Sequence, residues 1–474
     1  MTIKFGTDGW RGIIADDFTF ENVRYCAQGV AEHFQDKGLA QRGLVVGYDT
    51  RFASEQFAAA ASEVMAANGI KVYLCPRATP TPVISYGIMH LKAAGGIIIT
   101  ASHNPAQWNG FKVKTEYGTS APTEVVGDVE SRLPQIIAQR RVKRLPLDQA
   151  LSQGIIEYSD LDPAYLQHLG QLIDLESIRQ AGFKVVVDSM FGAGVGYFKK
   201  ILEGGRTEVV EINGERNPIF PGIQPEPIAR HLSKLSALVA KSGASVGLAT
   251  DGDADRIGIV DEHGIALTPL QIFALLALYL LEVRGERGAI VKTVTTSSML
   301  YKLGKLYGVP VYETPVGFKY VAPKMMAENA LIGGEESGGF GFRGHLPERD
   351  CMVAGIYVLD FINRLKKTPS QLIDYLYSKV GPHHYERVDL EFPSTEREKI
   401  MERLASRMPT TIAQSEVTKF NPIDGYHFTL ADGSWLLIRF SGTEPILRIY
   451  AEASTLERAK TLIAEGRRYW EFKW

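Results

Sequence analysis

Short apolar runs rich in β-branched residues alternate with longer helical patterns along most of the chain. The apolar runs are each followed by a Gly-rich or polar loop, and lie at residues 44–49, 96–100, 184–188 and 289–292. The longer helical patterns lie at residues 55–68, 228–241 and 270–282. Strands that alternate with helices in this way predict parallel, doubly wound α/β domains.

The last part of the chain has a different pattern. Strand-like stretches at 387–392, 435–440 and 447–452 are combined with helical patterns at 395–407 and 455–469. Strands that follow one another with few helices between them are typical of an α+β arrangement. We therefore expect a smaller α+β domain at the carboxyl end.

Turn-rich segments divide the chain into units. They lie near residues 144–162, at 261–264, and at 381–384, where the alternating pattern restarts. A chain of 474 residues is long enough for about three or four domains of ordinary size. We expect four units, at residues 1–150, 151–264, 265–380 and 381–474.

Composition excludes several classes of partner. The chain is 45% hydrophobic and 22% charged, with 52 Lys and Arg against 54 Asp and Glu and no basic block, so we expect no nucleic-acid partner. The longest apolar run, 272–281, is about half of the roughly 20 residues that span a bilayer, so we expect no membrane partner. The amino terminus lacks a secretory pattern, and the cysteines, Cys26, Cys75 and Cys351, lack disulfide or metal-ligand spacing. A cytoplasmic location with reduced thiols is expected.

In open α/β sheets ligands bind at the carboxyl ends of the strands, so the loops there are where chemistry is expected. The first such loop, residues 100–105, reads Thr-Ala-Ser-His-Asn-Pro and contains Ser102 and His103. A serine nucleophile needs a base or a cation to activate it, and His103 is its neighbour in sequence. Taken alone, the segment also fits a polar turn closed by Asn104 and Pro105.

The second loop carries three carboxylates at alternate positions. Asp251, Asp253 and Asp255 lie between the apolar stretches 246–248 and 257–259. Three acids within so few residues repel one another unless a cation lies between them. Hard oxygen ligands suit magnesium, so the loop predicts a magnesium site rather than a solvated acidic turn.

Two further loops have weaker signals. Residues 333–339, Gly-Gly-Glu-Glu-Ser-Gly-Gly, offer a carboxylate and a hydroxyl suited to sugar hydroxyls, but fit an ordinary turn equally well. Residues 439–445 combine Arg439 with two hydroxyl residues and a glycine, and Arg448 follows three residues later. Such a set can bind a phosphate, although a surface hairpin is the alternative.

Taken together, in this order and at these intervals, the four loops resemble those of the α-D-phosphohexomutase superfamily over the whole chain. The resemblance implies three similar doubly wound α/β/α domains and a smaller C-terminal α+β domain around a central cleft. It implies that Ser102 is phosphorylated and binds magnesium together with Asp251, Asp253 and Asp255.

The resemblance also assigns the other site residues. Those expected near the reacting phosphate are Arg11, His103, Lys112 and Arg256, with Lys112 the candidate for proton transfer. The sugar hydroxyls would contact Glu335 and Ser337, and Lys319 would bind ligand from a Thr-Pro-x-Gly-aromatic-Lys segment. The phosphate that is not transferred would bind Arg439, Ser441, Gly442 and Thr443.

The implied reaction interconverts hexose 1-phosphate and hexose 6-phosphate through a phosphoserine and a bound hexose 1,6-bisphosphate, in a monomer or homodimer. Many mannose-type and glucosamine-type relatives have a histidine at the end of the third loop, where this chain has Gly338 and Gly339. That departure and the segment around Lys319 favour glucose phosphates. A mannose or dual-specificity mutase is the alternative, followed by a glucosamine mutase.

Other functional classes fit less well. A serine hydrolase using Ser102 and His103 would need a Gly-x-Ser-x-Gly elbow, which the flanking residues do not provide. A non-catalytic sugar-phosphate sensor would keep the binding loops. It would have no use for the full set of Ser102, the three aspartates and Lys112.

Overall fold

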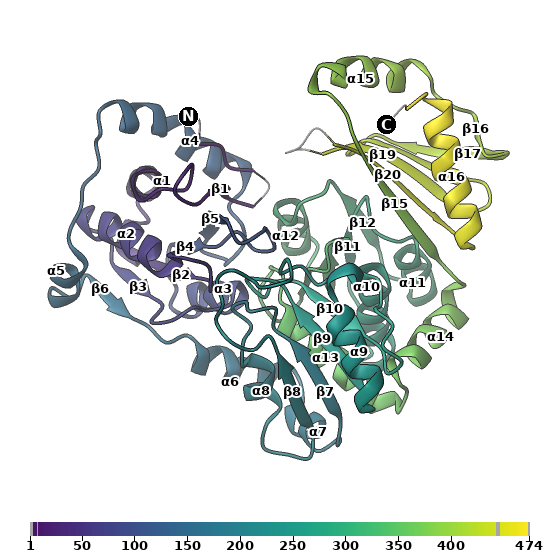
Figure 1. Cartoon of the computed structure of the whole chain (residues 1–474), viewed down its shortest axis with the longest axis horizontal. Helices are drawn as coiled ribbons and strands as arrows, with labels where there is room; N and C mark the ends of the chain where they lie inside the picture. Colours follow the sequence, from purple (N-terminus) through teal and green to yellow (C-terminus); the bar gives the residue numbers. More distant parts are fainter. Residues whose placement is uncertain (1–2, 7, 442–445, 473–474) are drawn as a thin grey trace.

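The computed structural model describes residues 3–6, 8–441 and 446–472, except for the side chain of residue 394. It contains three similar α/β units and a separate antiparallel unit at the carboxyl end (Figure 1). The predicted fold class is therefore confirmed. Among the described residues no helix has the length and apolar character needed to cross a bilayer.

The first unit is built on a six-stranded sheet. Its strand order is β1 (Trp10–Ile13), β5 (Trp108–Thr115), β4 (Gly95–Ile99), β2 (Leu44–Tyr48), β3 (Val72–Leu74) and β6 (Ile156–Tyr158). Strands β4, β2, β3 and β6 are parallel, and β5 is antiparallel to β4 and β1. The helices are α1 (Phe20–Asp36), α2 (Ser54–Ala67), α3 (Thr81–His90), α4 (Thr123–Ala138) and α5 (Leu147–Ser152).

The segment at residues 144–162 was expected to be a linker, but part of it belongs to the first sheet. That segment contains α5 and β6, and β6 pairs in parallel with β3, so the first sheet extends beyond residue 150. The segment is polar because only Ile156 of β6 is buried, as is usual for a strand at a sheet edge.

The second unit has a four-stranded sheet in the order β10 (Ile257–Val260), β9 (Val246–Thr250), β7 (Lys184–Asp188) and β8 (Glu208–Ile212). Its helices are α6 (Asp162–Leu172), α7 (Leu175–Arg179), α8 (Tyr197–Leu202) and α9 (Ser233–Ser242). The helix expected at 228–241 is interrupted. A 3-10 turn at Ala229–His231 precedes α9, and its tighter hydrogen bonding breaks the α-helical repeat.

The third unit repeats the arrangement, with the order β12 (Val311–Thr314), β11 (Ile290–Thr293), β13 (Ile332–Gly334) and β14 (Phe340–Phe342). Its helices are α10 (Pro269–Leu278), continued by a π-helical turn at Tyr279–Val283, then α11 (Met299–Tyr307), α12 (Phe318–Ala327), α13 (Cys351–Leu365) and α14 (Pro369–Val380). In all three units the first parallel strand lies between the second and third, and an antiparallel strand follows the third.

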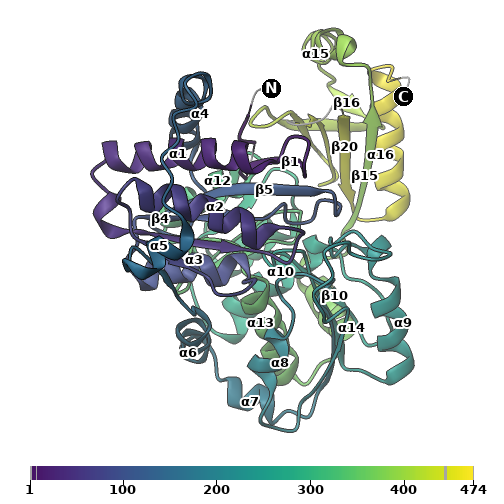
Figure 2. The same cartoon turned by 60° about the vertical axis from the view of Figure 1, so that its left-hand side comes forward.

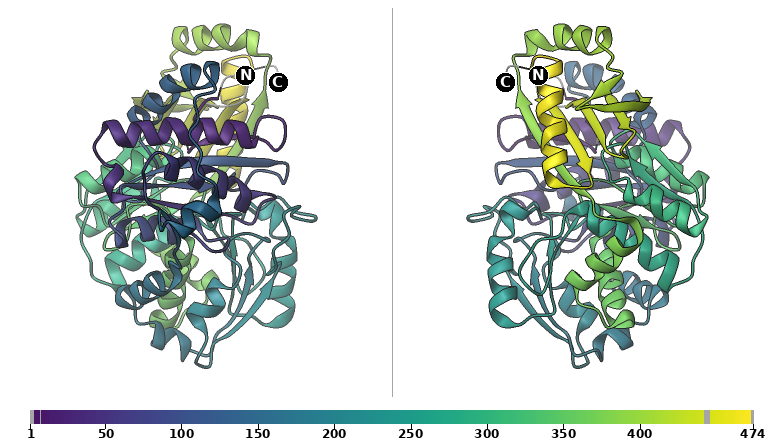
Figure 3. Two further views of the ribbon diagram at one scale, coloured as in Figure 1. Left: turned by 90° about the vertical axis from the view of Figure 1, so that its left-hand side faces the viewer. Right: turned by 90° about the vertical axis from the view of Figure 1, so that its right-hand side faces the viewer.

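The fourth unit is an antiparallel sheet in the order β15 (His384–Glu391), β20 (Ile446–Ala453), β19 (Trp435–Phe440), β18 (Tyr426–Leu430), β17 (Ser415–Asn421) and β16 (Thr411–Ile412). Helix α16 (Leu456–Tyr469) packs along β20 and β15, as Figures 2 and 3 show, and α15 (Arg397–Ser406) caps one end. The predicted strands β15, β19 and β20 are confirmed. Strands β16 to β18 were not predicted. β16 has only two residues, and β17 is largely exposed and polar.

The cores distinguish the fourth unit from the other three. One continuous apolar cluster contains residues from all of the first three units, among them Val45, Val185 and Phe273. The fourth unit has its own cluster, which includes Leu436 and Trp470. The first three units therefore pack as one body, and the fourth is joined to them by a smaller set of contacts.

Candidate active site

The three loops predicted to carry chemistry in the first three units occupy equivalent places in the fold. Ser102 lies between β4 and β5, the three aspartates between β9 and β10, and Glu335 between β13 and β14. Each loop thus connects the third parallel strand of its unit to the antiparallel strand. The threefold repeat of the sheet brings three different loops into mutual contact.

Ser102 is held rigidly by its backbone. It has a left-handed conformation, with φ of 51°, and is 1% exposed. Its N–H donates to Thr100 Oγ1 at 2.8 Å, and its carbonyl accepts from Arg51 Nη2 at 2.6 Å. A positive φ is uncommon for a residue other than glycine and is kept only where the surroundings enforce it.

The acidic loop lies directly against Ser102. Ser102 Oγ donates to Asp251 Oδ2 at 2.7 Å, although the two residues are 149 positions apart. An ideal Cβ on Gly252 would lie 2.3 Å from the Ser102 carbonyl oxygen, so only glycine permits this approach. His103 Nδ1 lies 3.4 Å from Ser102 Oγ. Burial, helped by Arg256 and Arg11, lowers the pKa of His103 well below its usual value, so this imidazole is neutral.

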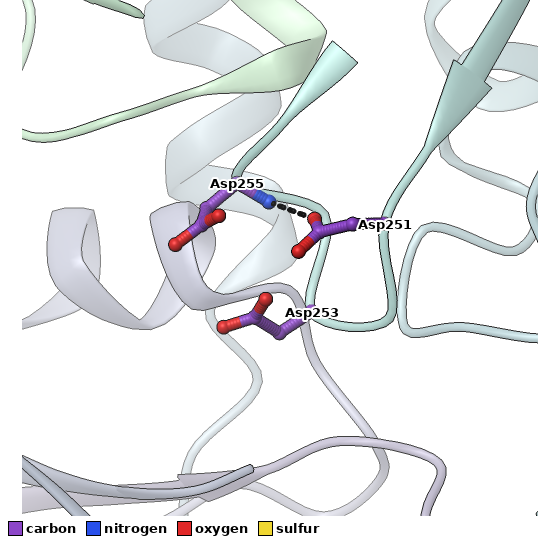
Figure 4. Close-up of side chains that lie close together, drawn as sticks. All are labelled: Asp251, Asp253 and Asp255. Atoms are coloured by element: carbon purple, nitrogen blue, oxygen red, sulfur yellow. Dashed lines mark hydrogen bonds between the residues drawn. The ribbon is translucent and has the colours of Figure 1, made fainter. Parts of the chain in front are cut away.

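The three aspartates form a group that could hold a metal ion. One carboxylate oxygen from each of Asp251, Asp253 and Asp255 lies within 4.8 Å of the others, and all three residues are buried (Figure 4). Asp251 Oδ1 accepts from the backbone N–H of Asp255 at 2.9 Å, which curls the loop. Asp253 Oδ1 and Asp255 Oδ1 have no hydrogen-bond partner among the described residues. Buried carboxylate oxygens without a partner suit a hard divalent cation.

The ammonium group of Lys112, from the first unit, faces these acids. Lys112 Nζ on β5 lies 2.8 Å from both Asp253 Oδ2 and Asp8 Oδ2, and 3.6 Å from Asp255 Oδ2. Burial alone would lower the pKa of Lys112, but Asp253 and Asp8 raise it above its usual value. Burial likewise opposes ionisation of Asp253, and Lys112 nevertheless holds the pKa of that carboxyl well below its usual range. Lys112 is therefore an ammonium ion in this site.

Arg11 and Arg256 contact the two loops that carry Ser102 and the three aspartates. Arg11 Nη1 donates to the side-chain oxygen of Asn104 in the Ser102 loop. The Arg256 guanidinium lies 3.8 Å from Glu226 Oε1 and 4.0 Å from Asp255 Oδ1. The backbone N–H of Arg256 donates to Asp251 Oδ1 at 3.1 Å. Both predicted arginines are thus close to the loops around Ser102, where they add positive charge.

The third loop holds one carboxylate in place and leaves one hydroxyl unpaired. Glu335 is 7% exposed, and its Oε1 accepts from the backbone N–H of Gly317 at 3.0 Å. Burial raises the pKa of Glu335. Ser337 Oγ is buried without a hydrogen-bond partner among the described residues. Lys319 is half-buried in the first turn of α12, two residues after Gly317, and lies 5.3 Å from the ring of Tyr320.

The fourth loop is described only in part. Arg439 and Arg448 face each other as a cross-strand pair on β19 and β20. Ser441 is buried, and its N–H donates to the Ile446 carbonyl at 2.8 Å. The other two predicted residues, Gly442 and Thr443, lie outside the described residues. Two arginines at the base of one loop produce a strongly positive local field.

Arg349 and Asp8 were not predicted from the sequence. Arg349 Nη2 lies 2.9 Å from both Asp8 Oδ2 and Asp255 Oδ2, and Nη1 lies 3.8 Å from Glu335. Arg349 thus connects the acidic loop to the third loop. The charged triplet Glu348, Arg349 and Asp350, directly before the apolar helix α13, was the available signal.

Family models match most of the chain, and known proteins match nearly all of it. The descriptions are phosphoglucomutase/phosphomannomutase α/β/α domain I at residues 2–140, domain II at 163–264, domain III at 268–380 and the C-terminal domain at 395–468.

Individual relatives carry different names. A phosphoglucomutase/phosphomannomutase of Thermococcus kodakarensis is 31% identical over 98% of this chain and 97% of its own. A phosphoglucosamine mutase of Carboxydothermus hydrogenoformans is 30% identical over 97% of both. A crystal structure from Thermus thermophilus, provisionally named a phosphomannomutase, is 33% identical over 99% of both chains, with a TM-score of 0.84. These matches and the shared four-unit architecture place the chain in the phosphoglucomutase/phosphomannomutase family of α-D-phosphohexomutases.

Proposed function

We propose that this protein is a magnesium-dependent phosphohexomutase that interconverts hexose 1-phosphates and hexose 6-phosphates, with glucose phosphates as the preferred substrates. The observation that carries the proposal is the contact of 2.7 Å between Ser102 Oγ and Asp251 Oδ2, within a buried group of three acids. A hydroxyl so placed can carry a phosphate that shares a cation with the carboxylates. Hexose 1,6-bisphosphate is the bound intermediate and the activator that first phosphorylates Ser102.

Asp251, Asp253 and Asp255 would hold the magnesium ion together with the phosphate on Ser102. The bound ion would offset charge on the phosphoryl group during transfer. Arg11, Arg256 and the Lys112 ammonium surround the same place and add positive charge where the equatorial phosphate oxygens become more negative.

The second phosphoryl transfer is the reverse of the first, at the other phosphate of the sugar. In the first, the free hydroxyl of the hexose monophosphate attacks phosphorus, the bond from phosphorus to Ser102 Oγ breaks, and the hydroxyl proton ends on Ser102 Oγ. In the second, Ser102 Oγ attacks the other phosphate of the bisphosphate, and the proton returns to the sugar oxygen left behind. Lys112 can relay this proton, because its ammonium gives one proton to the leaving oxygen and accepts the proton of the attacking hydroxyl.

Between the two transfers the bisphosphate must reverse its direction. Glu335 and Ser337 would hold the sugar hydroxyls, and Lys319 would add a cation at the edge of this loop. Arg439, Ser441, Gly442 and Thr443 would hold whichever phosphate is not being transferred. A site that accepts either end of the sugar explains why one serine can be both donor and acceptor.

Glucose is the first choice because Gly339 replaces the histidine that many mannose-type and glucosamine-type relatives have. A mannose or dual-specificity mutase is the second candidate, since relatives with both names match the chain over nearly its whole length. Steady-state rates with glucose 1-phosphate, mannose 1-phosphate and glucosamine 1-phosphate, each with its catalytic bisphosphate, test this choice. A higher kcat/KM for mannose or glucosamine phosphate would overturn it.

The reaction class is tested by Ser102→Ala. We expect a loss of turnover of at least about a thousandfold, because the proposed reaction carries the phosphate on the Ser102 hydroxyl. Ser131→Ala, at an exposed hydroxyl on α4, is the matched control and should behave as wild type. Phosphate transferred from radiolabelled hexose 1,6-bisphosphate should remain on the wild-type protein and not on Ser102→Ala. Near wild-type turnover by Ser102→Ala would exclude the mechanism, and full binding with no turnover in the wild type would favour a sensor.

A further inference from the structure

One carboxylate oxygen of Asp424 joins Arg439, in the fourth unit, to the backbone of the third unit. It lies in the turn between β17 and β18 of the fourth unit. Its Oδ2 accepts from Arg439 Nε at 2.8 Å and from the backbone N–H of Val316, in the third unit, at 2.9 Å. The side chains of Asp424 and Arg439 are 23% and 12% exposed, so the pair is largely shielded from water. We refer to Asp424, Arg439 and Val316 as the Asp424 bridge.

The residue after Asp424 explains how the bridge forms. Gly425 has φ of +111°, and an ideal Cβ there would lie 2.5 Å from the Ile438 carbonyl oxygen and 3.2 Å from Arg439 Cα. Only glycine allows the turn to press this closely on the end of β19. The turn therefore fixes Asp424 beside the arginine that begins the fourth loop.

The segment of the third unit that contacts Asp424 also donates a hydrogen bond to the third loop. Val316 and Gly317 are adjacent in the connection between β12 and α12. The N–H of Val316 donates to Asp424, and the N–H of Gly317 donates to Glu335 Oε1. One short segment thus binds a carboxylate from the fourth unit and a carboxylate from the third loop, which ties the position of Arg439 to that of Glu335.

The way the fourth unit is attached makes this connection important. Its main core is separate from the core shared by the other three units. A small apolar cluster joins the third and fourth units, in which Val294 packs with Trp435, Leu437 and Tyr450, and Val316 packs against it. Polar contacts also join the two units, among them Arg387 Nη1 to Glu336 Oε1 at 3.1 Å and Asn421 Nδ2 to Glu313 Oε1 at 2.6 Å. The Asp424 bridge differs from these contacts because it includes Arg439 itself, so it bears directly on where that guanidinium lies.

We propose that Asp424 is a positioning residue, which orients Arg439 toward the phosphate that is not being transferred and keeps Arg439 at a fixed distance from Glu335. This inference rests on the proposed mutase function. A guanidinium is a rigid fork of five N–H donors, so holding Nε fixes the direction of the others. The same contact would retain the bisphosphate while it reverses, because retention requires that the fourth unit stay on the third.

Asp424→Asn keeps the size of the side chain and removes its charge. We expect KM for the hexose 1-phosphate to rise about tenfold, with kcat within about twofold, because binding of the distal phosphate is weakened and the chemical step is not. The variant should also need more added hexose 1,6-bisphosphate for full activity, since more intermediate escapes in each cycle. Asp424→Glu, which restores the charge, should recover part of the loss.

A double-variant cycle separates positioning from a general structural role. If Asp424 acts through Arg439, Arg439→Lys and the double variant with Asp424→Asn should have similar KM values. Asp432→Asn is the matched control: it removes a carboxylate that pairs with Arg458 at 2.9 Å, in the next turn of the same sheet, and should leave KM unchanged. Titration calorimetry with inorganic phosphate gives a readout independent of turnover, and Asp424→Asn should bind it about tenfold more weakly.

An unchanged KM and unchanged phosphate affinity in Asp424→Asn would overturn the inference, as would effects that add fully in the double variant. Either result would leave the mutase function intact as long as Ser102→Ala is inactive. Turnover by Ser102→Ala would instead remove the mutase function, whatever Asp424→Asn does. The two failures are therefore distinguishable.

Discussion

The side chain of Arg349 occupies the space that a side chain at Gly339 would need. An ideal Cβ on Gly339 would lie 2.3 Å from Arg349 Cδ and 2.7 Å from Cγ. These atoms belong to the stem of Arg349, whose guanidinium pairs with Asp8 and Asp255. The glycine at the end of the third loop and the arginine before α13 therefore depend on each other, and a histidine at position 339 would require Arg349 to move.

Gly339→Ala should displace Arg349. We expect a loss of about 1–3 kcal/mol of unfolding free energy from overpacking, and at least a tenfold fall in kcat/KM, because Asp255 and Glu335 lose their shared cation. Chemical denaturation and steady-state kinetics measure the two effects. Gly170→Ala, in α6 with nothing within 4 Å of the added Cβ, is the control and should be neutral or slightly stabilising. Wild-type kinetics in Gly339→Ala would contradict this account of Arg349.

Most of the site could be found in the sequence because its loops directly follow apolar strands. The runs before Ser102 and Asp251 are strands β4 and β9, whose residues are all buried. A strand buried on both faces leaves a continuous apolar signal, and its end marks where polar residues can meet a ligand. This is why isolated sequence patterns located three loops that meet in space.

What the sequence could not supply was the pairing between distant charges. Arg349 lies 341 residues from Asp8, and neither stands next to a strand pattern that would mark it. Similarly, β17 pairs with β18 although it alternates weakly and is mostly exposed. Contacts of this kind depend on how the units pack against one another, which local periodicity does not encode.

Removal of Lys112 should make stability depend on magnesium. Lys112→Met leaves Asp8, Asp253 and Asp255 without their common ammonium, which should cost about 3–5 kcal/mol without metal. Added Mg²⁺ should restore more stability to this variant than to the wild type, since the ion supplies the missing positive charge. Thermal unfolding with and without Mg²⁺ measures this.

Lys114→Met is the control for this effect. Lys114 is a buried lysine on the same strand, but it pairs with Glu348 at 2.8 Å and not with the three aspartates. Its loss should destabilise the protein equally with and without Mg²⁺. The same magnesium response in both variants would argue against a cation site at the aspartates.

Asp350→Ala should be among the most destabilising single substitutions. Asp350 Oδ1 caps α13 by accepting from the N–H groups of Met352 and Val353, and Oδ2 accepts from Tyr165 at 2.7 Å and contacts His345 at 2.8 Å. Since Asp350 is fully buried, its loss leaves several donors without partners. We expect the unfolding free energy to fall by about 3–5 kcal/mol.

Asp174→Ala tests whether the effect of Asp350→Ala is only that of a helix cap. Asp174 caps the short helix α7 by accepting from the N–H of Ser177 at 3.0 Å in an exposed contact. Its removal should cost about 1 kcal/mol. Equal losses in the two variants, measured by chemical denaturation, would mean that the buried contacts of Asp350 with Tyr165 and His345 contribute nothing.

His427 should make stability fall as the pH falls below neutrality. This side chain is 8% exposed and stacks on Trp435, with ring centroids 5.0 Å apart. Burial, only partly opposed by Glu313, lowers its pKa in the folded protein to about 4, against about 6.5 when unfolded. Between these values the unfolded state binds more protons, so the stabilising contribution is complete above about pH 6.5 and is lost as the pH falls toward 4.

This difference in the pKa of His427 between the folded and unfolded states lowers the unfolding free energy by about 3 kcal/mol at pH 4 and below. His427→Phe keeps an aromatic ring against Trp435 and cannot titrate, so its unfolding free energy should fall less between pH 6.5 and 4 than that of the wild type. Denaturation with urea at several pH values gives the comparison. Glu313, whose pKa Lys292 lowers to about 2 against the effect of burial, loses its contribution only below about pH 4.5. Other buried histidines with a lowered pKa, such as His103, titrate in both proteins, so the difference between the two curves above about pH 4.5 belongs to His427. Parallel curves for wild type and His427→Phe over this range would show that His427 does not titrate as inferred.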